Sequence, residues 1–434
     1  MMMKAVSKAA LLSSLAALAV IAPGSAQAGG FYLQEQSVKG AGRAFSGEVA
    51  DQGAASLWWN PASIGGLQGG SAHIGFSAIL PKGDLDNVGT AIVRPGQAPA
   101  PVGGDQRSED PINKGYLPTG AIAYGITPEI AVGLTIASPY SFTTNYDETS
   151  WARYTADKTR LRTYDIQPSI AVMPLPGLSL GAGLNIEYAK ANLGNYLPNL
   201  SAALPDGHQN LKGDGWDLGW TLGAQYAYGP ATFGVSYKSS VKHKLSGEMI
   251  TSGLLGPLAG QNGTIATHAT FRTPWQLNFG TRVKVTEALT LNGQVSRFGW
   301  GKFDAIRLGD PVNVAIPEHY RDTWSFAGGV DYDLSPKWTI RGGIQHDQTP
   351  TRNGERDARV PDSNRWNFAL GTSYAVTQAF TLDAAANYIH FKDAKIDRTT
   401  AAYAGSPVQT PILVDGEINN ARAIVLSIGG RLTF

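Results

Sequence analysis

The sequence contains no cysteine, and beyond its N-terminus it has no apolar run long enough to cross a bilayer as a helix. The first absence excludes disulfides and thiol chemistry, and the second does not fit a helical membrane protein. Charged residues make up only 16% of the chain, whereas soluble proteins average roughly 25%. The formal net charge is +1, so the composition does not indicate nucleic acid or another strongly charged partner.

The first 28 residues have the three parts of a secretory signal peptide. Lys4 and Lys8 give a positive start, residues 9–21 form an apolar stretch too short to span a bilayer, and residues 26–28 form an Ala-Gln-Ala cleavage site. We therefore expect cleavage after Ala28. The alternative, an uncleaved anchoring helix, lacks the ~20 apolar residues that a span needs.

The C-terminal segment, residues 421–434, alternates between apolar and mostly small or polar side chains. One face carries Ile424, Leu426 and Ile428, whereas Ser427 lies on the other. A period of two with one apolar face is the pattern of a strand. About fourteen such segments occur along the chain, at residues 71–80, 117–126, 130–146, 158–173, 177–190, 216–228, 231–245, 274–285, 288–300, 324–334, 337–347, 365–376, 381–390 and 421–434.

These segments predict an all-β fold, a fourteen-stranded antiparallel transmembrane β-barrel over residues 71–434. Short turns alternate with long loops, as in barrels of Gram-negative outer membranes, whose periplasmic turns are short and outer loops long. We therefore expect a place in the cell outer membrane, surrounded by its lipid, with the terminal Phe434 as a contact for the barrel assembly machinery. A soluble all-β protein would also alternate and is the alternative.

Residues 29–70 do not follow the strand pattern. They are rich in Gly, Ala and Ser, and they carry two tryptophans at 58–59 just before Asn60, Pro61 and Ala62. A segment with so many apolar side chains is not expected to be a free tail. Because a fourteen-stranded barrel is wide enough to leave a channel unless something fills it, we expect this segment to be an N-terminal hatch, a plug inside the lumen.

Pro139 interrupts the third predicted strand. Proline cannot donate to a strand ladder and is normally confined to edges, first residues or bulges. A closed barrel has no edge, and each unsatisfied backbone group facing lipid would cost several kcal/mol. We therefore expect the wall to kink here, into protein or a cavity. The alternative is a plain β-bulge at the rim.

Two predicted long loops, residues 191–215 and 246–272, carry many apolar side chains. An exposed apolar patch marks a binding site more often than not, and a groove between two such loops would capture amphipathic molecules. The alternative is that the loops pack on each other as a lid. The candidate ligand-binding residues in these loops are Tyr196, Leu197, Leu200, Leu254, Leu255 and Leu258.

Three polar residues near the outer end are further candidates. Arg307 follows an aromatic stretch, and Lys190 and Asn195 lie where the fifth strand enters its loop. A cation beside an apolar pocket would suit a carboxylate head group. Taken singly, each residue also fits a solvated loop position.

The search for catalytic chemistry is negative. The seven histidines show no metal-ligand spacing such as H-E-x-x-H. The chain has no G-x-S-x-G nucleophile motif and no phosphate-binding loop. We therefore predict no catalytic residue, no metal, no cofactor and no enzyme activity.

Several short motifs follow one another in a fixed order along the chain. They are Gly-Gly-Phe-Tyr-Leu at 29–33, the glycine-rich stretch at 40–48, Asn-Pro-Ala at 60–62, and further stretches at 300–303, 324–329, 341–343, 347–350 and 362–366. Together they resemble the FadL/TodX family of outer-membrane transporters for long-chain fatty acids and other hydrophobic compounds. The resemblance covers essentially the whole mature chain, and the order of the motifs is what makes it specific.

The resemblance implies a monomeric barrel with a hatch and a kinked third strand that opens the wall sideways. It implies capture between the loops at 191–215 and 246–272 and an inner pocket that touches Phe31. It also matches Arg307 to a basic residue that contacts the ligand head group, whereas Asn195, with Lys190 nearby, departs from the family pattern. The residues expected at the lateral opening are Ser138, Pro139, Tyr140, Ser141 and Phe142.

The function expected from these features is passive transport of fatty acids or of aromatic or aliphatic hydrocarbons. The route runs from apolar outer loops to a lumen pocket and then through the strand-three kink into the membrane. Two alternatives remain open. A general polar-solute porin would have charged loops and no plug, and a barrel lipid hydrolase would need a nucleophile, a base and an orienting group at one end of the lumen.

Overall fold

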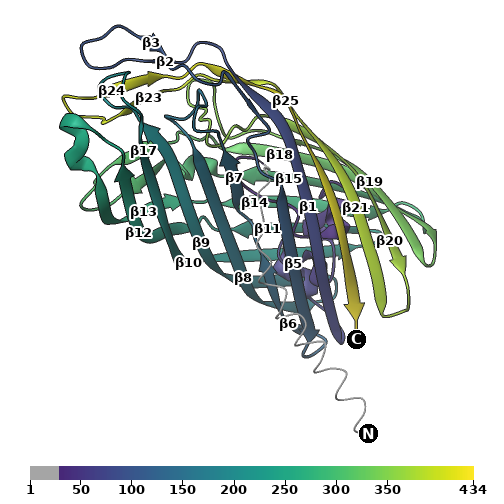
Figure 1. Cartoon of the computed structure of the whole chain (residues 1–434). Coiled ribbons are helices and arrows are strands. Elements are labelled where there is room, and N and C mark those ends of the chain that lie inside the picture. Colours follow the sequence, from purple (N-terminus) through teal and green to yellow (C-terminus); the bar gives the residue numbers. More distant parts are fainter. Residues whose placement is uncertain (1–28) are drawn as a thin grey trace, which may run out of the picture.

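The computed structural model describes residues 29–434, and the predicted signal peptide at residues 1–28 lies outside them. The described chain forms one closed antiparallel barrel of fourteen wall strands, with the N-terminal segment inside it (Figure 1). This confirms the predicted fold class. No helix in the described part of the chain is long and apolar enough to cross a membrane.

The wall strands follow one another around the barrel in chain order, and three of them are interrupted. In order they are β1 (Gly70–Asn87), β5 (Gly115–Gly125), β6 with β7 (Ile130–Ala137 and Ser141–Asn145), β8 (Lys158–Leu175), β9 (Leu178–Leu197), β10 (Gly207–Tyr228), β11 with β12 (Ala231–Lys238 and Lys242–Ser252), β13 with β14 (Gly263–Arg272 and Gln276–Lys284), β15 (Leu289–Phe298), β18 (Thr323–Ser335), β19 (Trp338–Asp347), β20 (Arg365–Ala375), β21 (Phe380–Phe391) and β25 (Gly416–Thr433).

Shorter strands and helical turns lie at the outer end of the barrel and inside its lumen. Four short strands form a separate outer sheet, seen at the upper end of Figure 1. The short strands are β2 (Ala91–Ile92), β3 (Ala100–Pro101), β23 (Thr399–Ala402) and β24 (Thr410–Leu413) in that sheet, and β4 (Arg107–Glu109), β16 (Ala305–Leu308), β17 (Ala315–Pro317) and β22 (Ala394–Ile396) beside the wall. The helical turns are α2 (Val38–Ala41), η2 (Glu48–Ala50), η3 (Ala54–Ser56), η4 (Pro61–Ile64), η5 (Gly256–Gln261) and η6 (Trp300–Lys302).

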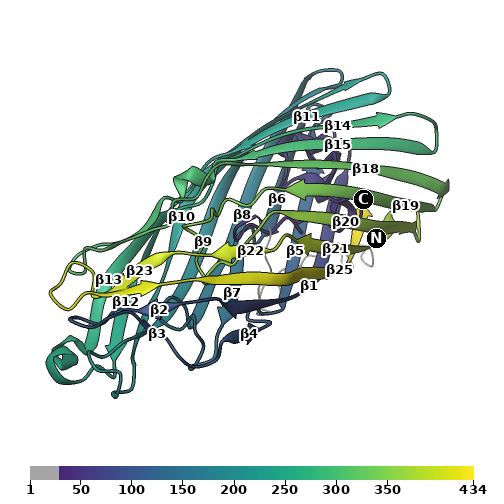
Figure 2. The same cartoon turned by 90° about the horizontal axis from the view of Figure 1, so that it is seen from above.

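The barrel closes where β1 pairs with β25, the first and last wall strands (Figure 2). Ser71 lies opposite Thr433 at one end of this seam. The Gly70 N–H donates to the Phe434 carbonyl at 2.5 Å, and the Phe434 N–H donates back at 2.9 Å. A side chain at position 70 would collide with the Phe434 ring, so glycine is required at this closure.

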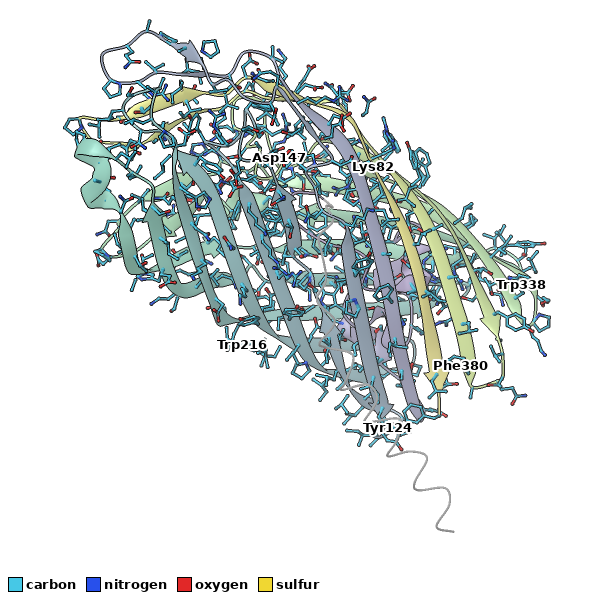
Figure 3. The ribbon with its side chains drawn as sticks, viewed as in Figure 1. Lys82, Tyr124, Asp147, Trp216, Trp338 and Phe380 are labelled. Atoms are coloured by element: carbon cyan, nitrogen blue, oxygen red, sulfur yellow. The ribbon has the colours of Figure 1, made fainter. Side chains whose placement is uncertain are left out.

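The wall is apolar outside and polar inside, the reverse of a soluble barrel. On β10, Trp216 and Leu218 are 59% and 65% exposed, whereas the alternate residues Thr221 and Gln225 are buried in the lumen. Trp216 and Trp338 lie on the outside of the barrel (Figure 3). Alternation with the apolar face outward is the pattern of a lipid-facing wall, so the soluble alternative is excluded.

The N-terminal segment ahead of β1 lies in the lumen, as predicted for a hatch. The Asn60 side chain accepts the N–H of Ala62 and so caps η4, and its amide donates to the Val49 carbonyl at 2.7 Å. Wall glycines let the segment approach closely, since a Cβ at Gly223 or Gly181 would strike Asn60 or Ala62. The Asn-Pro-Ala motif therefore joins the hatch to the wall by close packing and hydrogen bonds.

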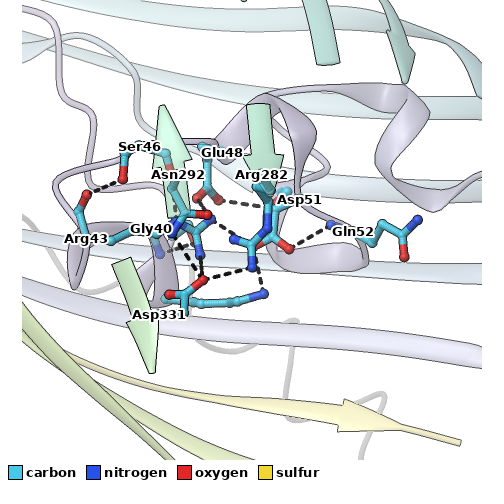
Figure 4. A network of polar contacts seen from close by, with 12 residues as sticks. Gly40, Arg43, Ser46, Glu48, Asp51, Gln52, Arg282, Asn292 and Asp331 are labelled. Atoms are coloured by element: carbon cyan, nitrogen blue, oxygen red, sulfur yellow. Dashed lines mark hydrogen bonds and ion pairs between the residues drawn. The ribbon is translucent and has the colours of Figure 1, made fainter. Parts of the chain in front are cut away.

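A buried ion network also joins the hatch to the wall (Figure 4). Arg43 pairs within the hatch with Glu48 at 2.7 Å and Asp51 at 2.8 Å. Arg282 of β14 reaches Asp51 at 3.2 Å and Asp331 of β18 at 2.8 Å. Removal of one partner from such a buried network is expected to cost about 3–5 kcal/mol, because a charge is left unpaired.

The two apolar loops are shorter than predicted. Of residues 191–215, only 198–206 connect strands, and of residues 246–272, only 253–262 do, because β9, β10, β12 and β13 continue outward as paired strands. The seventh and eighth wall strands are also interrupted, at residues 239–241 and 273–275. Apolar and polar side chains do not alternate strictly in these extensions, for example at 191–197 and 207–215, so the sequence alone predicts loops there.

Candidate functional site

The third wall strand is broken at Ser138–Tyr140, between β6 and β7. Ala137 lies opposite Asp165 of β8, and Ser141 lies opposite Arg162. Three residues (138–140) therefore face two (163–164) on β8, so strand three carries one extra residue. This is the count of a β-bulge, but the structure places it well inside the wall rather than at the rim.

The other side of the broken strand has lost its pairing with β5. The β5–β6 ladder runs from Gly125 only to Gly120, opposite Ile136. Within the described chain, no pairing joins residues 115–119 of β5 to strand three. Contact resumes further out, where Ile112 forms an isolated bridge with Thr144. The wall is therefore unzipped between the second and third strands over about five residues.

The N-terminal segment supplies the pairing that strand three lacks. The Leu33 N–H donates to the Pro139 carbonyl at 2.7 Å, and the Ser141 N–H donates to the Phe31 carbonyl at 3.0 Å. Tyr32 and Tyr140 form an antiparallel bridge between these bonds. Residues 137–144 are all buried, without the alternation seen elsewhere in the wall, because strand three is covered on both faces here.

Phe31 is the centre of an aromatic cluster beside the break. Its ring centroid lies 5.9 Å from that of Tyr140 and 5.7 Å from that of Phe142, both on strand three. It lies 4.9 Å from Trp300 and 5.1 Å from Phe303, which follow β15. The Phe31 side chain is 1% exposed, so it closes the space between the break and the lumen.

On the outer side of Phe31 lies an apolar cavity of about 710 Å³, counting the part that is open to solvent. Ligand-binding pockets in proteins are lined mostly by hydrophobic and aromatic side chains. The hydrophobic and aromatic residues that line this cavity are Phe31, Phe142, Leu161, Ala191, Leu193, Leu211, Leu245, Ala269, Phe271, Phe303, Ile306 and Val360.

The cavity also has a polar end, where Glu318 and Arg359 contribute to its lining. The Arg398 guanidinium lies 3.8 Å from Glu318 and 3.1 Å from Asp357. Burial raises the pKa of the Glu318 carboxyl to about 8, and Asp357 adds to the rise, while Arg398 and Arg359 oppose it. An acid that is largely protonated at neutral pH can donate as well as accept a hydrogen bond.

The three predicted polar residues lie in different surroundings in the structure. Asn195 accepts a 3.2 Å hydrogen bond from Arg359, so it holds a residue that lines the cavity. Lys190 is on the exposed face of β9, since the inward positions are Ala189 and Ala191. Arg307 is exposed and forms a two-bond pair with Asp304, so neither of these cations reaches the cavity.

The predicted apolar loop residues form a separate outer cluster. Leu197, Leu254 and Leu258 are buried together, with Leu200 and Tyr403 packed against them. Tyr196 packs against a different group and contacts the His208 ring at 5.0 Å between centroids. Leu255 is 41% exposed. Most of the predicted loop residues are therefore packed against other side chains, as in the alternative in which the loops form a lid. Leu255 is the one that stays open to solvent.

Of the predicted ligand-binding residues, only Phe31 lines the cavity, together with Phe142 from the opening. Arg359 and Glu318 were missed because they lie in irregular outer segments, where no periodicity indicates direction. Leu161 could have been predicted from the sequence, because it lies at an inward position of β8 between the inward polar residues Thr159 and Thr163. In residues 29–434, no group of three or more metal-ligating side chains comes together.

Comparison with known proteins supports one assignment. The family model described as outer membrane protein transport protein (OMPP1/FadL/TodX) matches residues 19–434. The chain is 27% identical over 436 residues to the long-chain fatty acid transport protein of Escherichia coli O6:H1 (strain CFT073), covering 91% of this chain and 94% of that protein. It is 26% identical over 428 residues to outer membrane protein P1 of Haemophilus influenzae, covering 88% and 92%.

Solved structures agree on the fold. A FadL homologue from Pseudomonas aeruginosa superposes with a TM-score of 0.81 at 23% identity, covering 93% of this chain and 100% of that chain. The toluene transporter TbuX of Ralstonia pickettii superposes with a TM-score of 0.65 at 18% identity, covering 92% and 98%. The family match spans the barrel and the hatch alike, and the lipid-facing wall agrees with a place in the Gram-negative outer membrane. The chain therefore belongs to the OMPP1/FadL/TodX family of outer-membrane transport proteins.

Proposed function

We propose that this protein carries hydrophobic molecules passively across the outer membrane and releases them sideways through the break beside strand three. The observation that carries the proposal is that the apolar cavity and the break share a boundary. Phe31 and Phe142 line the cavity, and the same two rings lie against the broken strand. A molecule in the cavity is therefore one aromatic layer away from the gap in the wall.

The names of similar proteins support a hydrophobic cargo. One relative is named a long-chain fatty acid transport protein, and a protein of the same fold is named a toluene transporter. Because the family consists of transport proteins, this chain is a transporter and not an enzyme. Fatty acids and aromatic or aliphatic hydrocarbons are the cargo classes that we propose.

The sideways route follows from the polarity of the lumen. Below the cavity the lumen is filled by the hatch and its buried ions, including Arg43 and Asp51. Moving an acyl chain through such surroundings would cost about 0.8 kcal/mol for each exposed CH₂. Exit into lipid between β5 and strand three avoids that cost.

Entry is proposed from the outer end. The leucine cluster around Leu254 and Leu258 presents Leu255 to solvent, and this apolar surface would take up the cargo. In this proposal the protein acts as a monomer in outer-membrane lipid. The exposed C-terminal Phe434 is proposed as the contact for the barrel assembly machinery.

The testing experiment is a binding titration of the purified protein with decanoate, toluene and decane, combined with sugar uptake by liposomes that carry the protein. We expect saturable binding of at least one hydrophobic ligand and sugar uptake no faster than in protein-free liposomes. Rapid sugar uptake with no hydrophobic binding would overturn the proposal in favour of a general porin.

A further inference from the structure

A small group of buried acids surrounds the start of the described chain. Asp362 and Asp347 are 0% and 4% exposed. Arg365 lies 3.0 Å from Asp347 and 3.5 Å from Asp362. Glu35, 5% exposed, completes the group, and burial raises its pKa to about 7.

These acids have more acceptor oxygens than donors. Asp347 Oδ2 accepts from Arg365 and from Gln34 at 2.9 Å. No donor among residues 29–434 hydrogen-bonds to Asp347 Oδ1, Asp362 Oδ1 or Glu35 Oε2. Buried polar atoms without partners are rare, because each loses its hydration without replacement. Arg365 Nη1, 3.5 Å from Asp362 Oδ1, is the one donor in this group that also has no hydrogen-bond partner among residues 29–434. Three acceptor oxygens therefore face one such nitrogen, and the group has room for a further donor.

Gly29 lies within this group. The Gly30 N–H donates to Asp362 Oδ2 at 2.8 Å. Gly29, Asp347 and Arg365 line one small cavity, and a Cβ on Gly29 would lie 3.0 Å from an Arg365 nitrogen. Gly29 therefore lies beside Asp347 and Arg365 and precedes the residue that is bonded to Asp362.

Gly29 is also the residue that follows the predicted cleavage site. Hydrolysis of the Ala28–Gly29 peptide bond consumes one water and leaves a carboxylate on Ala28 and an amine on Gly29. An α-amine has a pKa of about 8 and is protonated at neutral pH. It then carries three N–H donors and one positive charge, where the amide that it replaces has one donor.

We propose that the α-ammonium group of Gly29, released by removal of the leader, docks on Asp362 and Asp347 and latches the N-terminal segment against the broken strand. Residues 31–33 pair with strand three only a few residues further on, so a docked amine fixes the start of that pairing. Burial raises the pKa of the Asp362 carboxyl despite Arg365, which agrees with a site that needs more positive charge. Leader removal thus completes the seal that the proposed transport must open.

The test measures the α-amine itself and needs no ligand, so it can fail independently of the proposed transport. The mass of the purified protein must first show Gly29 as its first residue. The pKa of the amine then follows from its acetylation rate at a series of pH values, read by mass spectrometry of the N-terminal peptide. A docked amine has a pKa above about 8 and reacts at least tenfold more slowly in the folded than in the unfolded protein.

The pKa separates docking from simple burial, because burial without acids lowers an amine pKa. A folded-state pKa at or below that of the unfolded chain, or a different first residue, overturns the proposal. Asp362→Asn with Asp347→Asn should bring the rate within about threefold of the unfolded chain, whereas the exposed Asp393→Asn should leave it unchanged. Should the double variant fail to fold, insertion of one glycine after Ala28 displaces the amine with every acid intact, and undiminished protection there also contradicts the latch.

Discussion

The backbone N–H of Leu33 donates a 2.7 Å hydrogen bond to the carbonyl of Pro139. The N-terminal segment thereby pairs with the one wall strand that has turned away from its neighbour β5. Proline has no N–H to offer β5 in return. The opening in the wall and the segment that covers it are thus one structural unit, held by bonds that are separate from the Asn60 contacts and ion pairs of the hatch body.

The extra residue in strand three means that deletion of one residue, Pro139, can test the sideways exit. Removal of Pro139 gives two residues opposite two on β8, so we expect β6 and β7 to become one continuous strand and to pair with β5. Uptake of hydrophobic ligand by cells should fall at least tenfold, because the sideways exit is closed. Binding to the purified protein should persist, although the covering segment loses its partner.

Pro139→Ala is the matched control for this deletion. It removes the proline but keeps the extra residue, so the bulge should persist with most of the uptake. Normal uptake by the deletion variant, with a folded barrel shown by its heat-sensitive migration in a gel, would refute the sideways route.

The head-group prediction concerns Arg359. Arg359→Ala should weaken decanoate binding roughly tenfold, because a charge-assisted hydrogen bond contributes about 1.5–3 kcal/mol. Toluene binding should change less than threefold. Arg307→Ala is the matched control, and it should leave both affinities unchanged because that cation is exposed and paired with Asp304. Equal losses for the two ligands in Arg359→Ala would count against a head-group role.

Binding of an anionic ligand should depend on pH through Glu318. Its folded-state pKa of about 8 means that the carboxyl is mostly neutral at pH 7 and mostly charged at pH 9. The charged form should repel a ligand carboxylate, so decanoate affinity should fall roughly fivefold over this range, about 1 kcal/mol.

Glu318→Gln should remove this pH dependence of decanoate binding, while the affinity for toluene should not change with pH in either protein.

The titration of Glu318 also affects the stability of the folded protein. Because the folded-state pKa lies above the ordinary value of 4.5, the stability associated with the neutral acid is lost as the pH rises toward 8. If decanoate binding by Glu318→Gln still depends on pH in the same way, another group is responsible for that dependence.

The ion network predicts a leak when the hatch is loosened. Arg43→Leu leaves Glu48 without its cation, at a cost of about 3–5 kcal/mol, while Asp51 keeps Lys39 and Arg282. Liposomes that carry this variant should take up a small sugar measurably faster than those with the unchanged protein. Arg107→Leu is the control, since Arg107 is 53% exposed in its pair with Asp84. An unchanged sugar rate in Arg43→Leu would show that the hatch is held without the network.

The outward aromatic and aliphatic residues could be predicted from the sequence, because lipid on one side and a polar lumen on the other impose a strict period of two. The same parity places Lys190 outward, since its neighbours at 189 and 191 face the lumen. Pro139 was recognisable because a closed wall has little tolerance for a residue without an N–H. The cavity's polar end was not predictable, because Arg359 and Glu318 lie in irregular segments brought together only by the fold.

The seam between β1 and β25 joins the two ends of the barrel sequence, with Gly70 and Phe434 bonded to each other. One edge of the first wall strand therefore stays unpaired until the last wall strand reaches it. A chain truncated by a single strand would expose two open edges to its neighbours. The loss of either strand would thus leave a sheet that cannot close on itself.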